Sequence, residues 1–135
     1  MPTTSAPIFQ ALVQRVRTDN TLKAAGVHEG VAPQRTPYPF LVYNQQAGDY
    51  EYDTTKVKIE ASFSFFVFSR NQVEAHNLDQ LVMNVLQDAP LSVSGQSTLF
   101  CRRVMDVPIP PDIDEEGKKI FQVGGLYEVW TDQTK

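Results

Sequence analysis

Residues 57–67 read Val-Lys-Ile-Glu-Ala-Ser-Phe-Ser-Phe-Phe-Val, and they contain the clearest periodicity in the chain. Every odd-numbered residue of this stretch is apolar, and the even-numbered residues from 58 to 64 are Lys, Glu, Ser and Ser. Successive side chains of a strand point to opposite faces of a sheet. A period of two with one apolar face therefore predicts a half-buried strand in an antiparallel sheet.

The far end of this strand departs from the alternation. Phe66 and Phe68 place large aromatic rings on the face that is otherwise polar. Two interpretations fit this feature: the next helix covers the rings, or the rings belong to a contact with another protein.

The segments before this strand predict a helix and a first strand. Residues Ala6 to Thr18 carry an apolar stripe at helical spacing, and residues 19–25 predict a short helical turn that ends at Gly26. Tyr38 to Gln46 has the composition of a strand, and the prolines at its start indicate that it begins at a sheet edge.

The segments after it predict a second helix and two further strands. Asn71 is a suitable N-cap, Glu74 is placed to reach back to that cap, and Pro90 sets the end of the helix. Strands are predicted at about 98–107 and 119–131, with Gly124 and Gly125 marking a bulge or a close backbone approach.

The order helix-strand-strand-helix-strand-strand predicts an α+β fold, with a mostly antiparallel sheet and helices packed on one face. The length of 135 residues suits one domain, residues 1–135, in which we expect residues 1–5 and 132–135 to be loose ends. The apolar runs are too short to span a bilayer, and the first residues lack the layout of a secretory signal. We therefore expect a cytosolic site of synthesis and no membrane contact.

Acidic residues are concentrated in two segments that lack the composition of strands. The first contains Asp49, Glu51 and Asp53, and the second follows three prolines and contains Asp112, Asp114, Glu115 and Glu116. With a net charge of −4, the chain is a poor candidate for tight binding to a nucleic-acid backbone, because that affinity comes mainly from lysine and arginine.

No arrangement of residues points to catalysis or to a bound metal or cofactor. The two histidines, His28 and His76, have no partner at catalytic or metal-ligand spacing, and the acids at 112–116 lack the spacing of a calcium loop. The single cysteine, Cys101, lies among strand-like residues, where a buried and inert thiol is expected. Arg102 and Arg103 point to opposite faces of a strand, which suits ion pairing.

The segment before the first long strand resembles a known family. Residues 26–43 read Gly-Val-His-Glu-Gly-Val-Ala-Pro-Gln-Arg-Thr-Pro-Tyr-Pro-Phe-Leu-Val-Tyr. They are similar to the tail terminator, or tail completion, proteins of long-tailed bacteriophages, in which an amino-terminal helix precedes such a turn and strand. The resemblance covers nearly the whole chain in outline, and it is specific in this segment.

The resemblance implies a non-enzymatic head-tail joining protein. Such proteins form a hexameric ring on the last ring of the tail tube, end tail elongation and give the head connector a docking surface. The implied partners are further copies of the chain, the tail-tube protein and the connector protein, with only weak contact to DNA passing through the lumen. The implied location is the head-proximal end of the tail in the virion, and the host cytoplasm during assembly.

We expect the subunit or partner contacts to come from the two acidic segments. The expected contact residues are Tyr50 and Tyr52 in the first, and Ile109, Asp112, Ile113, Asp114, Glu115 and Glu116 in the second. In the alternative interpretation, these residues belong to ordinary loops that fold back on their own domain. Three other functions stay open: another phage neck or minor tail protein, a small nucleic-acid-binding or ligand-binding α+β module, and a small enzyme of unfamiliar type.

Overall fold

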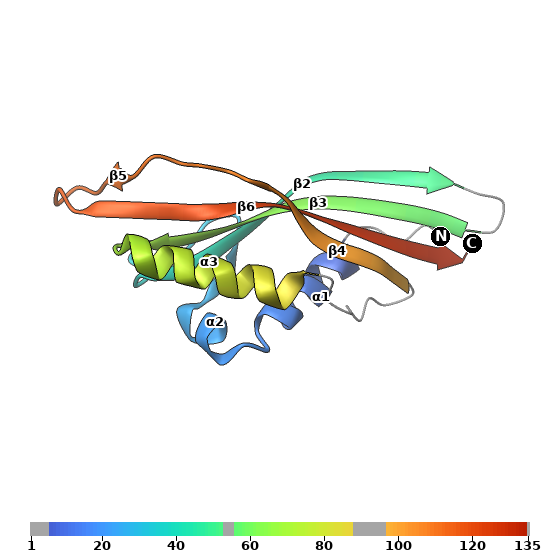
Figure 1. Cartoon of the computed structure of the whole chain (residues 1–135), viewed down its shortest axis with the longest axis horizontal. Helices are drawn as coiled ribbons and strands as arrows, with labels where there is room; N and C mark the ends of the chain where they lie inside the picture. Colours follow the sequence, from blue (N-terminus) through green and yellow to red (C-terminus); the bar gives the residue numbers. More distant parts are fainter. Residues whose placement is uncertain (1–5, 53–55, 88–96, 135) are drawn as a thin grey trace.

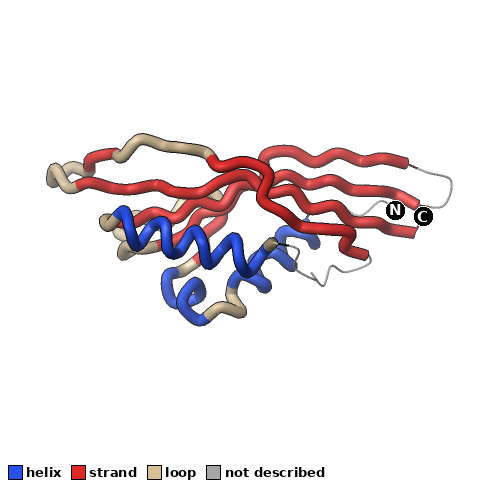
Figure 2. The backbone as a smooth tube through the Cα atoms, viewed as in Figure 1, coloured by secondary structure: helices blue, strands red, loops and turns tan. Residues whose placement is uncertain are grey.

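The computed structural model describes residues 6–52, 56–87 and 97–134, and it shows one long sheet with helices under one of its faces (Figures 1 and 2). The helices are α1 (Ala6–Val16), α2 (Asn20–Ala25) and α3 (Gln72–Leu86). The strands are β1 (Val27–Glu29), β2 (Phe40–Tyr52), β3 (Lys56–Ser69), β4 (Ser97–Asp106), β5 (Asp112–Ile113) and β6 (Lys119–Thr134).

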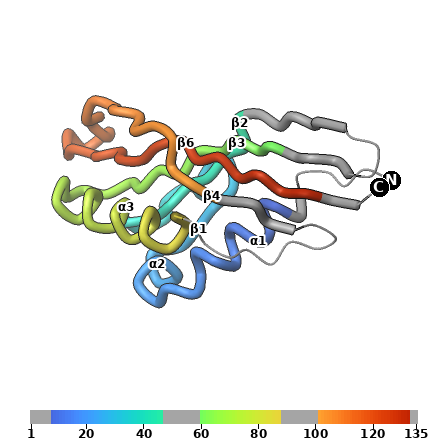
Figure 3. Tube along the Cα trace, turned by 45° about the vertical axis from the view of Figure 1, so that its right-hand side comes forward, coloured from blue at the N-terminus to red at the C-terminus, as the bar shows by residue number. Residues whose placement is uncertain are grey.

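The sheet has the order β1-β2-β3-β6-β4, and β5 pairs with β6 beyond the end of β4. All neighbouring strands are antiparallel except β1 and β2. Figure 3 shows α1, α2 and α3 on the same side of the sheet. The predicted α+β fold, its mostly antiparallel sheet and the packing of the helices on one face are confirmed.

The core lies between this face and the helices. Ile8, Leu12 and Val16 of α1 are fully buried, as the apolar stripe predicts, and so is Cys101 of β4. Aromatic rings fill the centre of the layer: Phe63 of β3 stacks on Tyr127 of β6 with 5.5 Å between ring centroids. Burial raises the pKa of the Tyr127 hydroxyl above its ordinary range.

Several boundaries differ from the sequence-based predictions. β2 continues to Tyr52, so Tyr50 and Tyr52 lie in a strand paired with β3 and not in a loop, whereas Asp53 lies outside the described residues. β6 continues to Thr134, so residues 132–134, expected to be loose, pair with β3. The short strands β1 and β5 were not predicted.

The predicted second helix, α3, begins at the predicted N-cap, but the Glu74 side chain has a different partner from the predicted one. Asn71 Oδ1 accepts a hydrogen bond from the Glu74 N–H at 3.0 Å, which confirms the N-cap. The Glu74 carboxylate does not return to the cap residue, because it accepts a 2.7 Å hydrogen bond from the Ser69 hydroxyl instead. α3 ends at Leu86, and Pro90 lies outside the described residues.

The Gly124-Gly125 pair marks a close approach of backbones. A Cβ at Gly124 would overlap the Phe65 carbonyl oxygen on one neighbouring strand, and a Cβ at Gly125 would overlap the Met105 carbonyl oxygen on the other. The register between β3 and β6 stays regular here, and the irregularity lies on β4, between Arg103 and Met105. The alternative that the glycines form a bulge in β6 is therefore wrong.

Of the two interpretations of Phe66 and Phe68, the one in which the second helix covers the rings is wrong, and nothing in the structure tests a contact with another protein. Both residues alternate with the buried Phe65 and Val67, so they face away from α3. Phe68 stacks on Phe40 with 5.1 Å between ring centroids, and both rings line a hollow of about 490 Å³ with residues 30–36. At this end of the sheet, Phe68 therefore faces the loop between β1 and β2 and not α3.

Candidate assembly surfaces

The second acidic segment forms a hairpin that extends beyond the end of β3. β3 pairs with β6 only as far as Phe121, whereas β5 pairs with Lys119 and Ile120 of β6. Figure 1 shows β5 at the left-hand end of the molecule, away from the other strand ends. The exposed residues of this hairpin include Asp112, Ile113, Glu115 and Glu116, and Ile113 has 62% of its surface accessible.

Asp114 differs from its acidic neighbours because its carboxylate organises the turn. Its Oδ1 accepts hydrogen bonds from the backbone N–H groups of Glu116 and Lys118, each at 2.9 Å. Its Oδ2 lies 2.6 Å from Nη1 of Arg70. The Lys118 N–H and the other donors hold the pKa of Asp114 below its ordinary value of 3.8. Asp114 therefore acts within its own chain.

Arg70 lies at the junction of β3 and α3, and it links the hairpin to an aromatic cluster. Its guanidinium carbon lies 4.6 Å from the centroid of the Tyr38 ring, in a cation–π contact. Tyr38 in turn packs on Phe40 with 5.1 Å between centroids, and His28 packs edge-on against Phe40 at 6.1 Å. Sequence reasoning did not identify Arg70, because no local motif marks an arginine that bridges distant segments.

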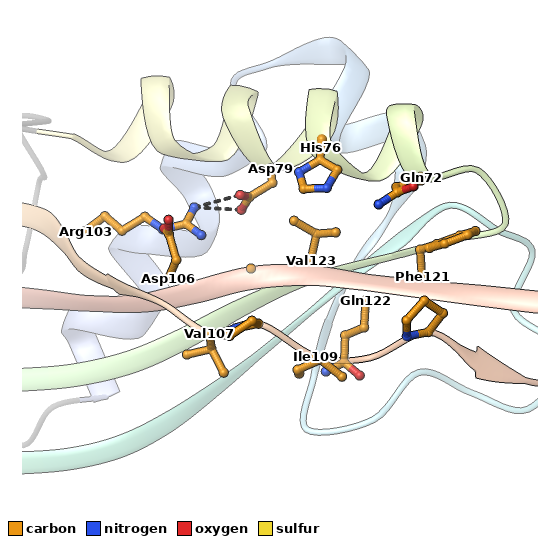
Figure 4. A pocket seen from close by; sticks show the side chains of 13 residues that line it. Gln72, His76, Asp79, Arg103, Asp106, Val107, Ile109, Phe121, Gln122 and Val123 are labelled. Carbon is orange, nitrogen blue, oxygen red and sulfur yellow. Dashed lines mark hydrogen bonds and ion pairs between the residues drawn. The ribbon is translucent and has the colours of Figure 1, made fainter.

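The proline-containing connection from β4 to β5 turns toward its own domain. Ile109 is half-buried and lines a cavity of about 410 Å³ between this connection and α3 (Figure 4). Phe121 and Val123 of β6 also line the cavity, and so does the exposed His76 of α3. Ile109 therefore differs from Ile113, which points to solvent.

A buried ion pair closes one end of this cavity. Arg103 Nη1 donates to both carboxylate oxygens of Asp79 at 2.8 and 2.9 Å, and Arg103 Nε lies 2.9 Å from Asp106 Oδ1 (Figure 4). The Arg103 side chain is only 7% exposed, while that of Arg102 lies at the surface. The prediction that the two arginines serve opposite faces is confirmed, and ion pairing is seen for Arg103.

The first acidic segment lies at the opposite end of the sheet from the hairpin. Tyr52 of β2 pairs with Val57 of β3, and Val57 pairs with Gln133 near the end of β6. Figure 1 shows this end of β2 at the right of the molecule and β5 at the left. The structure thus separates the two predicted contact segments and does not bring them together into one site.

The outer edges of the described sheet are formed by β1 with the rest of β2 on one side and by β4 on the other. β1 pairs only with Leu41–Tyr43, so no strand in the described part of the chain covers the rest of the outer edge of β2. β4 forms the other edge, where Val104 and Met105 are exposed. Sequence reasoning missed these two residues because a short apolar pair in a strand reads as core.

The described residues contain neither a candidate metal site nor a membrane-spanning helix. Among residues 6–52, 56–87 and 97–134, no group of three His, Cys, Asp or Glu residues is placed to hold a metal ion. The helices that the structure describes are all too short or too polar to cross a bilayer.

Solved structures with the same fold include part of a virus-like particle. A chain from the virion of a native gene transfer agent particle matches with a TM-score of 0.71 at 16% identity, over 96% of this chain and 99% of that chain. A second solved structure matches with a TM-score of 0.54 at 12% identity, over 95% of this chain and 96% of that chain. At these identities the likeness shows the fold alone. No curated protein matches the sequence.

The family comparison goes further than the fold. The sequence matches the family described as tail completion protein gp17 over residues 6–106, a span that runs from the first residue of α1 to the last residue of β4. The chain therefore belongs to the tail completion protein gp17 family and is a structural protein of the phage tail or neck.

Proposed function

We propose that this protein forms a hexameric ring that caps the tail tube, ends tail elongation and provides the surface on which the head connector docks. The observation that carries the proposal is membership of the tail completion family. The gene transfer agent chain with the same fold comes from a virion, which supports a place in the virion. The head-proximal end of the tail is the position that we propose. The host cytoplasm is the proposed place of assembly.

The shape of the chain supports assembly from identical subunits. The two candidate contact segments lie at opposite ends of one long sheet, and its two outer edges have different sequences. A contact between two different surfaces of identical subunits is head-to-tail, and such a contact closes into a ring when the rotation fits. One surface of each subunit is then left for the tube and another for the connector.

We assign the direct contacts to the residues that the fold presents outward. These are Ile113 with Asp112, Glu115 and Glu116 on the hairpin, all of which are exposed. From their position in the sequence we add Tyr50 and Tyr52, at the far end of β2. Ile109 and Asp114 support the hairpin from within, because the first lines a cavity and the second pairs with Arg70.

We further propose that the acidic hairpin lies at the rim of the lumen, where the carboxylates that the neighbouring subunit leaves uncovered keep passing DNA from adhering, since like charges repel across a narrow channel. The test replaces Asp112, Glu115 and Glu116 by lysine and leaves Asp114 in place. Slower DNA release from assembled tails is expected, and release at the normal rate would contradict this role.

Tube growth in vitro tests the capping function. The cognate tail-tube protein is polymerised with increasing amounts of this protein, and tube lengths are measured by electron microscopy. We expect the mean length to fall and growth to stop once each tube carries a cap. An unchanged length distribution at saturating protein would overturn the proposal.

A matched pair of variants distinguishes a specific contact of the hairpin from the general effect of removing an exposed apolar side chain. Ile113→Ser removes an exposed isoleucine from the hairpin, and Val31→Ser removes an exposed valine from the loop between β1 and β2. We expect Ile113→Ser to weaken capping and Val31→Ser to leave it unchanged. Equal effects of the two variants would mean that the hairpin makes no specific contact.

A further inference from the structure

We propose that Arg70 is a positioning residue, which fixes the hairpin of residues 112–120 in the orientation in which it docks on its partner. This inference rests on the proposed function, because it assigns a cause to the geometry of the proposed contact. Arg70 itself need not touch the partner.

The hairpin has few other connections to the sheet. β5 pairs with β6 through two residue pairs only, and Lys119 and Ile120 lie beyond the last residue pair of β3 with β6. A two-stranded hairpin without further packing is marginally stable in water. A contact from outside the hairpin is therefore needed to hold its tip in one orientation.

Arg70 supplies this contact, and the backbone next to it is held by hydrogen bonds. Its Nη1 reaches Asp114 Oδ2 at 2.6 Å, while its guanidinium lies over the Tyr38 ring. Arg70 directly follows the buried Ser69. The Ser69 hydroxyl accepts a 3.0 Å hydrogen bond from the Asn71 N–H and donates one to the Glu74 carboxylate. Arg70 thus lies at a hydrogen-bonded junction of β3 and α3. From there it contacts the hairpin through Asp114 and the segment before β2 through Tyr38.

The ion pair between Arg70 and Asp114 lies at the surface of the protein. The Arg70 side chain is 38% exposed and that of Asp114 is 17% exposed, so water screens the pair in part. The ion pair and the cation–π contact are each modest, and they act on the same guanidinium. A prearranged tip loses less conformational entropy when it docks, which raises affinity without adding any contact to the partner.

The first test measures the hairpin in the free protein. Amide hydrogen exchange of Gly117 and Lys118 is compared between the wild type, Arg70→Ala and Arg70→Lys. We expect exchange to be about fivefold to tenfold faster in Arg70→Ala, the range that the two contacts together support, and partly restored in Arg70→Lys. Arg17→Ala, which removes an exposed arginine after α1, is the control. Unchanged exchange in Arg70→Ala would overturn the proposal.

The second test measures capping of tail tubes. Arg70→Ala and Asp114→Asn are each expected to weaken capping, and the double variant is expected to cap no worse than Arg70→Ala alone, because Arg70→Ala already removes the contact with Asp114. If Arg70→Ala speeds exchange but caps as well as the wild type, while Ile113→Ser does not cap, the positioning role is wrong and the proposed function stands. If the wild type itself fails to cap tubes, the proposed function fails and this inference falls with it.

Discussion

The Arg103 guanidinium shows how a single residue can join α3 to the edge of the sheet. Its bidentate hydrogen bonds to Asp79 cross from β4 to the helix, and Asp106 adds a third carboxylate oxygen from the same strand. Removing one partner of such a pair leaves a buried charge without compensation, which costs more than the pair contributes. The two carboxylates are not equivalent, because the Asp79 side chain is 14% exposed and that of Asp106 is 86% exposed.

We predict that Asp79→Asn lowers the free energy of unfolding by about 3 kcal/mol, because Arg103 would stay buried without its main counter-charge. Asp106→Asn is the matched control and should cost less than about 1 kcal/mol, as expected for an exposed partner. Urea denaturation followed by circular dichroism measures both values. Equal losses for the two variants would show that Asp79 has no special role.

The second prediction at this scale concerns Gly124. A Cβ at this position would overlap the backbone of Phe65, which a central strand cannot move without losing its ladder. We predict that Gly124→Ala costs about 3 kcal/mol, at the upper end for overpacking. Gly117→Ala should cost about 1 kcal/mol, because nothing lies near its Cβ and only its φ of 80° is unfavourable. Thermal unfolding ranks the two, and the reverse order would contradict the close approach.

At the scale of elements, the hairpin depends on an ionised Asp114. The pKa of Asp114 is lowered in the folded protein, so its carboxylate stabilises the fold fully at pH values above its ordinary pKa of 3.8. This contribution is lost as the pH falls through the lower pKa of the folded state. We predict that the hairpin keeps its structure at pH 5 and loosens only below pH 3.8. Amide chemical shifts of Glu116 and Lys118 followed against pH give the midpoint. A midpoint above 3.8 would contradict the assignment.

The start of α3 gives a further prediction. Asn71→Ala removes the acceptor for the Glu74 N–H and should lower the free energy of unfolding by about 1 kcal/mol. Asn84→Ala lies within the same helix and should change stability by less than about 0.5 kcal/mol, since its 2.9 Å hydrogen bond to Gln80 is exposed. Denaturant midpoints of the two variants test this, and similar losses would rule out a specific capping effect.

Elements that keep a regular hydrophobic pattern over many residues were predictable from the sequence. Elements fixed by contacts with residues distant in the sequence were not. The alternation in β3 and the apolar stripe of α1 predicted their type and their buried faces. β1 is three residues long and pairs with β2 across a loop, which leaves no local pattern. The end of β2 contains Gly48, Asp49 and Glu51, so its composition indicates a loop, but its pairing with β3 holds it extended.

The same reason explains which parts of the candidate surface were predictable. Proline and acidic composition located the hairpin and the exposed Ile113. Composition could not show that Asp114 turns inward to Arg70, because 44 residues separate the two in the sequence (114 − 70). It also could not show that Ile109 lines a cavity against α3.

At the scale of the whole molecule, the fold is a long sheet with contact segments at its two ends and helices on one side. A sheet of this form, in a chain of the tail completion family, suits a subunit that meets like neighbours on two sides and different proteins above and below. Capping, termination and docking all depend on the proposed ring.

The most direct test counts the copies bound to each tail tube. Tubes of several lengths are prepared from the cognate tube protein, saturated with this protein and freed of excess, and the added mass per tube is measured by light scattering. We expect six copies at the capped end, independent of tube length. Copy numbers that rise with tube length, or a protein that stays monomeric with and without tubes, would contradict the proposed ring.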